Sequence, residues 1–253
     1  MTTDQERRFG GVGRLYGQGG RAALRAAHVC VVGIGGVGSW AAEALARTGV
    51  GRITLIDLDM VAESNTNRQI HALGDIYGKA KVDAMAERIL AINPDCQVTC
   101  IEDFVTPENA ATLLDDDFSA VIDAIDQVPA KVAMIAFCKR QKLPIVVAGA
   151  AGGQIDPTQV RVADLSQTVQ DPLLAKVRSA LRRNHGFPSA GKKFGIPAVF
   201  STEPLRYPTQ GQACDTHTGP AGLNCAGFGS SVCVTAVFGM AAASQVINLI
   251  ARP

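Results

Sequence analysis

Four closely spaced glycines follow a short apolar run in the sequence HVCVVGIGGVGSW at residues 28–40. Gly33, Gly35, Gly36 and Gly38 stand in the order of strand, glycine turn and helix that nucleotide-phosphate sites use. In such a site the glycines allow a tight turn, close approach of backbone N–H groups to phosphate oxygens, and packing of the helix on the strand. The phosphates then meet the positive end of the helix dipole. The pattern predicts a nucleotide site without specifying the nucleotide.

Carboxylates end the next apolar run, RITLIDLD at 52–59. They belong to Asp57 and Asp59, and Asp57 follows Gly38 by 19 residues. A dinucleotide-binding fold keeps its ribose-binding acid at this distance. Asp57 is therefore expected to hold a ribose, and these residues alone leave a nicotinamide cofactor open.

Cationic and amide side chains then separate the possible nucleotides. Asn65, Arg68 and Lys81 follow the second strand, and the apolar run 119–124 leads to Asp126. An enzyme that splits ATP at the α-phosphate needs converging cations and a carboxylate for Mg²⁺, whereas a nicotinamide enzyme needs apolar space for its ring. Each residue taken alone fits a surface charge or a helix N-cap. Their joint spacing favours the ATP site.

Apolar runs of five or six residues alternate with amphipathic segments up to residue 150. This alternation predicts an α/β protein with a Rossmann-like, mostly parallel sheet, helices on both faces, and a ligand at the carboxyl ends of the strands. Strands are expected at 28–33, 52–57, 97–101, 119–124 and 144–149, and helices at 37–48, 79–91, 107–115 and 129–141.

The rhythm changes after residue 150. We expect an antiparallel strand after Asp156-Pro157, a crossing segment over 171–226 rich in glycine, proline and basic residues, and an apolar helix at 229–250. This helix has no charged residue and is long enough for a membrane span, but serine, threonine, glutamine and asparagine dilute it. The composition favours a helix buried in a single domain, with a nucleotide-binding half at 28–150 and a variable half at 151–253.

The composition is that of an ordinary globular protein, with 47% apolar and 19% charged residues. The net charge of +1 neither favours nor excludes a polyanionic partner. Seven cysteines without a CxxC pair argue against a disulfide framework and predict a reducing, cytoplasmic location. The charged N-terminus shows no secretion signal.

Basic residues gather in the expected crossing segment. Between Asp171 and Glu203 the chain has no acidic residue and carries a local charge of +6. A solvated helix face is the default for such a run, and a surface that tracks nucleic-acid phosphates is the alternative. The residues are Lys176, Arg178, Arg182, Arg183, Lys192 and Lys193.

Several segments resemble the adenylation domain of the ubiquitin-activating-enzyme-like superfamily. These are GIGGVGSWAAEALARTGVGRITLIDLD, SNTNRQ, GKAK, NP and DAID. The resemblance implies a single adenylation domain that binds ATP and Mg²⁺, with a monovalent cation also allowed, and a homodimer. It implies that an arginine near the N-terminus reaches a partner's ATP, with Arg8 and Arg14 as candidates and Arg14 slightly favoured. It assigns ATP to the glycine turn, Asp57, Asn65, Arg68 and Lys81, and Mg²⁺ to Asp126.

Further segments resemble the tRNA threonylcarbamoyladenosine dehydratases within that superfamily. These are NRQIHAL, EDFVTPEN, VIDAID, GAAGGQIDPTQVRVADLSQTVQDPL and VFSTE. The resemblance implies ATP-dependent cyclisation of threonylcarbamoyladenosine beside the anticodon of ANN-decoding tRNAs, through an acyl adenylate. It makes tRNA rather than DNA the partner and assigns the basic run to tRNA binding.

Two alternatives stay open from the sequence. The first is adenylation of a ubiquitin-like or sulfur-carrier protein, for which Cys214, Cys225 and Cys233 are candidate thiols and sulfur-transfer proteins candidate partners. Branches with that activity often carry two CxxC pairs for zinc, and this chain has none. The second is a nicotinamide-dependent enzyme or a simple nucleotide-binding module.

Overall fold

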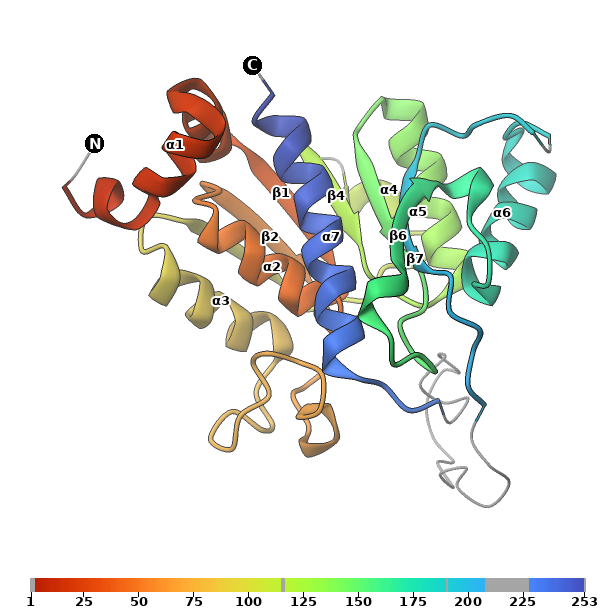
Figure 1. The fold of residues 1–253 in the computed structure, drawn as a ribbon, viewed down its shortest axis with the longest axis horizontal. Coiled ribbons are helices and arrows are strands. Elements are labelled where there is room, and N and C mark those ends of the chain that lie inside the picture. Colours follow the sequence, from red (N-terminus) through yellow and green to blue (C-terminus); the bar gives the residue numbers. More distant parts are fainter. Residues whose placement is uncertain (1–2, 115–116, 190, 208–227, 253) are drawn as a thin grey trace.

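A single seven-stranded sheet forms the centre of the protein (Figure 1). The computed structural model describes residues 3–114, 117–189, 191–207 and 228–252. The strand order is β3-β2-β1-β4-β5-β7-β6, and every pairing is parallel except that of β6 with β7. The strands are β1 (His28–Val32), β2 (Arg52–Ile56), β3 (Gln97–Ile101), β4 (Ala120–Asp123), β5 (Ile145–Ala148), β6 (Val160–Asp164) and β7 (Pro197–Ser201). The strand order reverses between β1 and β4, so a ligand crevice is expected there.

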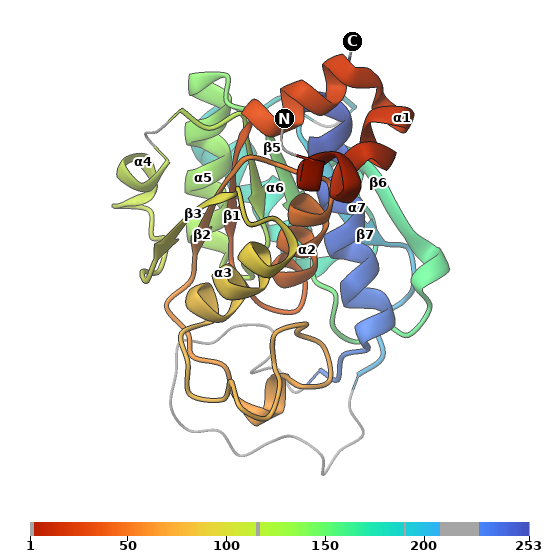
Figure 2. The same cartoon turned by 90° about the vertical axis from the view of Figure 1, so that its left-hand side faces the viewer.

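Helices cover both faces of the sheet, as the alternating sequence predicts (Figure 2). α2, α3 and α7 lie on one face, and α4, α5 and α6 lie on the other. Successive residues of β1 enter the two separate cores: Val29 and Val31 join the first, and Cys30 and Val32 join the second. The helices are α1 (Thr3–Ala26), α2 (Gly38–Arg47), α3 (Lys81–Ile92), α4 (Ala110–Leu113), α5 (Val128–Gln141), α6 (Pro172–His185) and α7 (Val232–Ile250), with short 3₁₀ turns at Glu63–Asn65, Pro157–Gln159 and Leu165–Gln167.

The predicted crossing segment at 171–226 contains regular structure that the sequence analysis missed. It includes α6 and β7, and β7 is an interior strand between β5 and β6. α6 buries Leu173, Leu174, Val177 and Leu181 on one side, at the spacing of an amphipathic helix. The expected antiparallel extension is confirmed, because β6 pairs antiparallel with β7.

An N-terminal helix, α1, also precedes the first expected element. It bends at Gly17, whose φ of 76° lies in the left-handed region. Phe9 and Leu24 are buried and attach the helix to the rest of the protein. The polar, glycine-rich sequence of residues 3–26 conceals this helix because its buried apolar residues are few.

The apolar C-terminal helix α7 packs as a core helix along one side. Val234, Phe238, Ala242 and Val246 are buried in the same core as α2 and β1. Gly239 permits this contact, since a Cβ there would lie 2.4 Å from the backbone oxygen of Val37. α7 is the one helix among the described residues long and apolar enough to cross a membrane, but 44% of its most apolar window is buried in the protein.

Candidate nucleotide site

A cavity of about 610 Å³ opens at the carboxyl ends of the parallel strands. The glycine turn after β1 forms one wall, with Gly33, Gly35 and Gly36. The loops after β2, β3, β4 and β5 complete it, and parts of the segments after β7 and before α7 lie along its rim. The cavity therefore occupies the place where the strand order reverses, as the sequence predicts.

The glycines of the turn have different structural tasks. Gly33 has a φ of 85° and turns the chain off the strand. A Cβ at Gly38 would lie 1.8 Å from the Gly33 carbonyl oxygen, so Gly38 allows α2 to start close against the strand end. Among the described residues, apart from Gly35 and its two neighbours in the chain, no atom lies within 4 Å of a Cβ built on Gly35, which lines the cavity. Gly38 thus serves packing, and Gly35 leaves room for a ligand.

We expect Gly35→Ala and Gly38→Ala to separate these tasks. Gly38→Ala should destabilise the protein by about 1–3 kcal/mol, because the new methyl group overlaps backbone. Gly35→Ala should leave the melting temperature unchanged and weaken ATP binding on the order of tenfold, because the methyl group enters the phosphate space. Thermal denaturation and calorimetric ATP titration measure the two effects. Equal loss of stability in both variants would contradict this division.

Asp57 is fixed at the floor of the cavity. Its carboxylate accepts hydrogen bonds from the backbone amides of Ile34 at 2.6 Å and Asp59 at 2.9 Å. Lys81 extends from the start of α3, with its Nζ 2.6 Å from Asp59 Oδ2 and 4.0 Å from Asp57 Oδ1. Burial raises the pKa of the Asp57 carboxyl, and the charge of Lys81 opposes this shift. The three side chains form one charged group beside the glycine turn.

Arg68 lies against Gly36 of the glycine turn. A Cβ on Gly36 would lie 3.2 Å from the Cγ and Cδ of Arg68, so the arginine stem runs directly over this glycine. Its Nη1 donates to the carbonyl of Ser64 and to Asn67 Oδ1, and burial lowers the pKa of the guanidinium. The buried Asn65 caps this loop by accepting from the Ala62 amide at 3.0 Å. Arg68 and Lys81 thus line the same cavity as the glycine turn.

Asp126 lines the same cavity from the loop after β4. A fully buried ion pair lies behind this loop, between Lys131 Nζ and Asp123 Oδ1 at 2.7 Å. Lys131 also donates to the carbonyl of Ala148 at 3.0 Å and so connects the ends of β4 and β5. The sequence did not predict this pair, because a lysine in a helix is usually exposed to solvent.

Other cavity residues escaped the sequence analysis as individual positions. Gln69 is buried beside Arg68, Asp103, Phe104 and Val105 follow β3, and residues 149–152 follow β5. Each group except Gln69 comes directly after a parallel strand. This position in the sequence is the feature that could have predicted these cavity residues. Among the described residues no cluster of three or more His, Cys, Asp or Glu side chains is arranged to hold a metal.

Two sets of predicted residues lie away from the cavity. Arg14 is exposed on α1, and Arg8 on the same helix is held by Asp4 and the Ile92 carbonyl. α6 begins at Pro172, which lines the cavity, and runs away from it, so Arg183 lies about 16 Å further along the helix. Within one chain the nucleotide residues converge, but the N-terminal arginines and most of the basic run do not join them.

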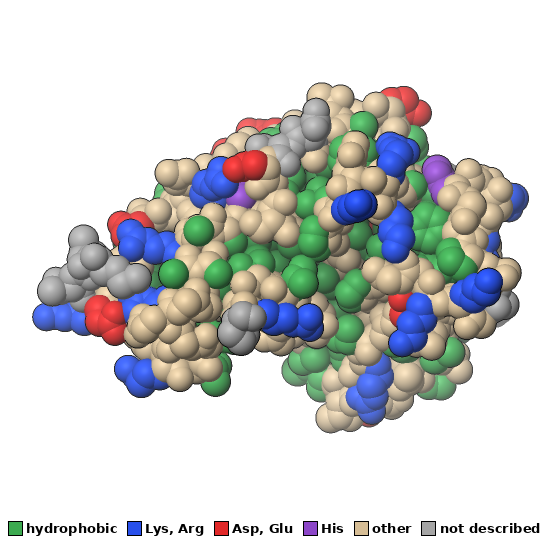
Figure 3. All heavy atoms as spheres, turned by 90° about the horizontal axis from the view of Figure 1, so that it is seen from above, with side chains coloured by type: hydrophobic (Ala, Val, Ile, Leu, Met, Phe, Trp, Pro, Cys, Tyr) green, Lys and Arg blue, Asp and Glu red, His purple; other side chains and the backbone are tan. Residues whose placement is uncertain are grey.

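The basic run is also divided by its contacts. Arg178 donates to Thr168 Oγ1, and Arg182 lies 5.2 Å from the centre of the Phe194 ring while donating to the Pro188 carbonyl. These two arginines support the local fold. Lys176, Arg183, Lys192 and Lys193 are exposed. In Figure 3, which views the end opposite to the cavity, Lys and Arg side chains recur over the half that carries α5 and α6.

His71 is buried in the loop that carries Arg68, and neither ring nitrogen has a hydrogen-bond partner among the described residues. Burial lowers its pKa to about 4, and Lys81 and Arg88 add to this shift. The unfolded chain binds the proton near pH 6.5, so stability should fall as the pH drops from about 6.5 to 4, by up to about 3 kcal/mol. Denaturant titrations should show this loss in the wild type and a smaller one in His71→Leu. Parallel pH profiles for both proteins would contradict it.

Comparison with known proteins identifies the family of this chain. Residues 11–253 match the ThiF family. The tRNA threonylcarbamoyladenosine dehydratase of Haemophilus influenzae is 53% identical over 245 residues, covering 96% of this chain and 93% of that protein. The enzyme of the same name from Escherichia coli is 56% identical over 247 residues, covering 95% and 92%.

Solved structures show the same relation at the level of the fold. The crystal structure of the Escherichia coli dehydratase TcdA in complex with ATP superposes with a TM-score of 0.89 at 52% identity, covering 98% of this chain and 96% of that one. Its complex with AMP gives the same values. The Salmonella typhimurium molybdopterin-synthase adenylyltransferase is 36% identical over 132 residues, about half of each chain. This chain therefore belongs to the ThiF family, in the same branch as the tRNA threonylcarbamoyladenosine dehydratases.

Proposed function

We propose that this chain uses ATP to cyclise threonylcarbamoyladenosine in ANN-decoding tRNA, with loss of water and release of AMP and pyrophosphate. One observation carries the proposal. Arg68 and Lys81 approach the cavity that the glycine turn, Asp57 and Asp126 also line. This is the charge arrangement for attack at an α-phosphate, in a chain more than half identical to named dehydratases over nearly its whole length.

The chemistry requires activation of a poor electrophile. A carboxylate does not expel hydroxide at neutral pH, so a carboxylate oxygen of the threonyl group attacks the α-phosphorus and pyrophosphate leaves. The carbamoyl group of the same side chain then attacks the acyl carbon and loses a proton to solvent, while the acyl C–O bond breaks and AMP leaves with the carboxylate oxygen. Because both groups share one short tether, this second step needs little help from the protein.

The protein's residues serve mainly the first step. In this proposal the backbone of the glycine turn and the start of α2 meet the phosphates, and Asp57 holds the ribose. Arg68 and Lys81 neutralise charge that develops on the phosphate oxygens, and replacing either should cost about 10²–10³-fold in turnover. Asp126 is a carboxylate facing the same space, which suits Mg²⁺ held by one protein oxygen together with phosphates and water. When bound, Mg²⁺ would supply further charge neutralisation at the α-phosphate.

Pyrophosphate exchange tests the function. The enzyme is incubated with ATP, labelled pyrophosphate and one of three additions: tRNA carrying threonylcarbamoyladenosine, a sulfur-carrier protein, or nothing. We expect exchange only with the modified tRNA, and cyclic product in the digested nucleosides by mass spectrometry. Exchange that depends on the carrier protein would instead support the second candidate activity. Cys233 is exposed on α7 and does not line the cavity, while Cys214 and Cys225 lie outside the described residues.

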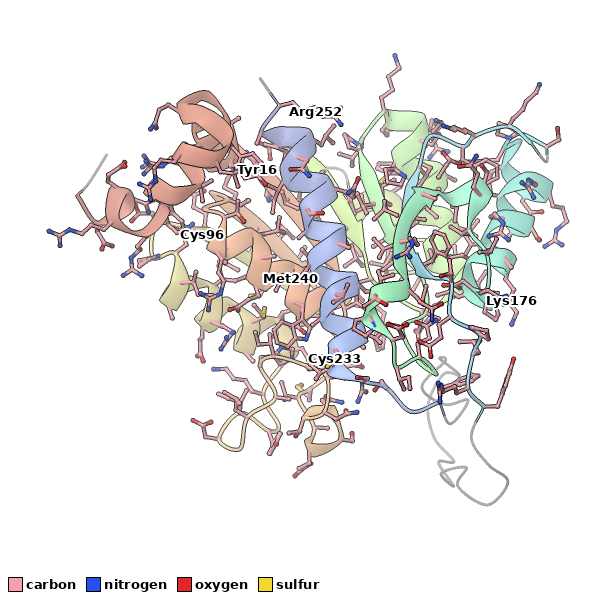
Figure 4. All side chains as sticks on the ribbon, viewed as in Figure 1. Tyr16, Cys96, Lys176, Cys233, Met240 and Arg252 are labelled. Atoms are coloured by element: carbon pink, nitrogen blue, oxygen red, sulfur yellow. The ribbon has the colours of Figure 1, made fainter. Side chains whose placement is uncertain are left out.

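We also propose that two copies of the chain form a homodimer. Val232, Val237, Met240 and Leu249 are exposed apolar side chains on α7. Figure 4 shows Met240 and Cys233 along this helix, in the layer toward the viewer. Burial of such side chains against a second copy would remove apolar surface from water.

A complementation experiment tests the dimer and Arg14 together. Arg14→Ala and Asp126→Ala should each be inactive if the Arg14 of one copy serves the partner's cavity. Co-expression should restore activity, since a mixed dimer holds one intact site. Light scattering gives the mass directly. A monomeric mass at the protein concentrations of the activity assay would contradict the proposed dimer. A fully active Arg14→Ala variant would exclude Arg14 from catalysis.

The exposed basic residues on and after α6 are proposed to bind tRNA phosphates. Reversal of Arg183 and Lys193 to glutamate should weaken tRNA binding and flatten its salt dependence, because the slope counts the phosphates neutralised. These residues are preferable to Arg182, whose contacts with Phe194 and Pro188 stabilise the fold. Filter binding at several salt concentrations measures the slope, and ATP affinity serves as the control. An unchanged slope would show that these basic residues form a solvated face that does not bind tRNA.

A further inference from the structure

The cavity has two chemically different sides. On one side of the glycine turn lie Asp57 after β2 and Phe104 after β3. On the other lie residues 149–152 after β5 and the segment 205–207 after β7. A nucleotide whose phosphates meet the glycine turn and whose ribose meets Asp57 extends toward β3. The side formed after β5 and β7 is therefore left for the second substrate.

Two glycines build that second side. The Gly153 amide donates to the Gly229 carbonyl at 2.8 Å, and the Gly153 carbonyl accepts from the Arg206 amide at 2.8 Å. Gly152 forms an isolated bridge with Ser230. A Cβ on Gly153 would lie 2.9 Å from Phe228 Cδ1, and its φ of 74° also favours glycine. The backbone thus holds the segments 205–207 and 228–230 together at the cavity rim.

This arrangement places two aromatic rings next to each other at the opening, with their planes tilted by 52°. The ring centres of Tyr207 and Phe228 are 5.3 Å apart, and both residues line the cavity. Tyr207 is 72% exposed, which is unusual for so large a side chain and leaves its ring available to a ligand.

One cation adjoins this aromatic pair, because Arg206 directly precedes Tyr207 in the chain. The Arg206 side chain is 64% exposed, and its Nε lies 3.3 Å from Oε1 of the buried Glu203. Lys176 is exposed on α6, about one turn beyond Pro172, which lines the cavity. Figure 4 shows Lys176 on α6 at the right-hand side of the molecule. Aromatic rings beside Arg and Lys are the usual components of sites for single-stranded nucleic acid.

We propose that Tyr207 and Phe228 form a stacking platform for an unpaired base of the RNA substrate, with Arg206 beside the RNA backbone. The proposal rests on the proposed function and specifies where the anticodon loop meets the protein. Stacking a base at the rim holds the loop while the threonyl carboxylate of the modified adenosine enters the cavity. RNA loops offer such unstacked bases, and aromatic side chains recognise them.

Substitutions at Tyr207 test the platform, because this exposed ring supports no core. Tyr207→Ala should weaken binding of a modified anticodon stem-loop by about 5- to 150-fold and leave ATP affinity unchanged. Tyr207→Phe should bind within about twofold of the wild type, and Tyr207→Leu should resemble the alanine variant because it lacks a π face. Val169→Ala, at an exposed apolar residue outside the cavity, is the matched control. If Tyr207→Leu bound the stem-loop as tightly as Tyr207→Phe, this result would overturn the stacking proposal and indicate a simple apolar contact.

Stem-loops that each lack one base identify the stacked position. On the RNA that lacks the stacked base, Tyr207→Ala should cause no further loss of binding affinity. On the other RNAs it should weaken binding as much as on the complete stem-loop. An equal cost on every RNA would overturn the proposal. Formation of cyclic product by the wild-type enzyme is measured separately, so failure of the platform is distinguishable from failure of the proposed function. Phe104→Ala, on the nucleotide side, should weaken ATP binding while RNA affinity stays constant.

Discussion

Asp126→Ala should reduce turnover by at least about 10³-fold while the protein stays folded. Asp126 follows the end of β4 and lines the cavity, so its loss removes the carboxylate that faces the phosphate space. The cores on both faces of the sheet do not include this side chain. The catalytic defect should therefore exceed any change in stability.

Single-turnover formation of AMP and of cyclic nucleoside measures the effect of Asp126→Ala. Asp126→Asn keeps the size of the side chain and removes its charge, so it should be nearly as defective. Asp75→Asn removes an exposed carboxylate outside the cavity and should retain wild-type turnover. Circular dichroism and melting temperature control for folding. Full activity in Asp126→Ala would remove this residue from the mechanism.

The nucleotide half of the chain was predictable because all its strands except β3, at the edge of the sheet, are buried almost throughout. β1 is buried at every residue, and such a strand must be a continuous apolar run. The acids at the ends of these runs could be placed at one edge of the sheet, since parallel strands end together. Asp57, Asp59 and Asp126 line one cavity for this reason.

The variable half was less predictable, although one element left readable signals. α6 has Asp171 as its N-cap, proline at its first position and Gly186 after its end with a φ of 65°. The basic residues of that segment concealed these signals. α1 gave weaker ones, because its glycines and few apolar residues do not mark a helix. The separation of Arg14 from the cavity depends on how α1 sits against the sheet, and a linear pattern does not contain that placement.

Lys131→Met should destabilise the protein by about 3–5 kcal/mol, because it leaves the buried Asp123 carboxylate without its cation. Both side chains are fully buried, and Asp123 Oδ2 has no hydrogen-bond partner among the described residues. Burial raises the pKa of the Asp123 carboxyl, and Lys131 opposes that shift. The loss of Lys131 also frees the Ala148 carbonyl, so the loops after β4 and β5 lose a shared anchor.

A double-mutant cycle separates the ion pair from ordinary packing. Asp123→Leu combined with Lys131→Met replaces both charges by apolar groups and should recover much of the stability lost in Lys131→Met alone. Denaturant titrations at one fixed protein concentration measure all four proteins, since association would otherwise shift the midpoints. Lys139→Met, at an exposed lysine on the same helix that donates to the Phe194 carbonyl, is the matched control and should cost less. Additive losses in the cycle would show that Asp123 and Lys131 do not act as a pair. A large coupling energy would instead show that a buried ion pair stabilises the strand ends next to the loop that carries Asp126.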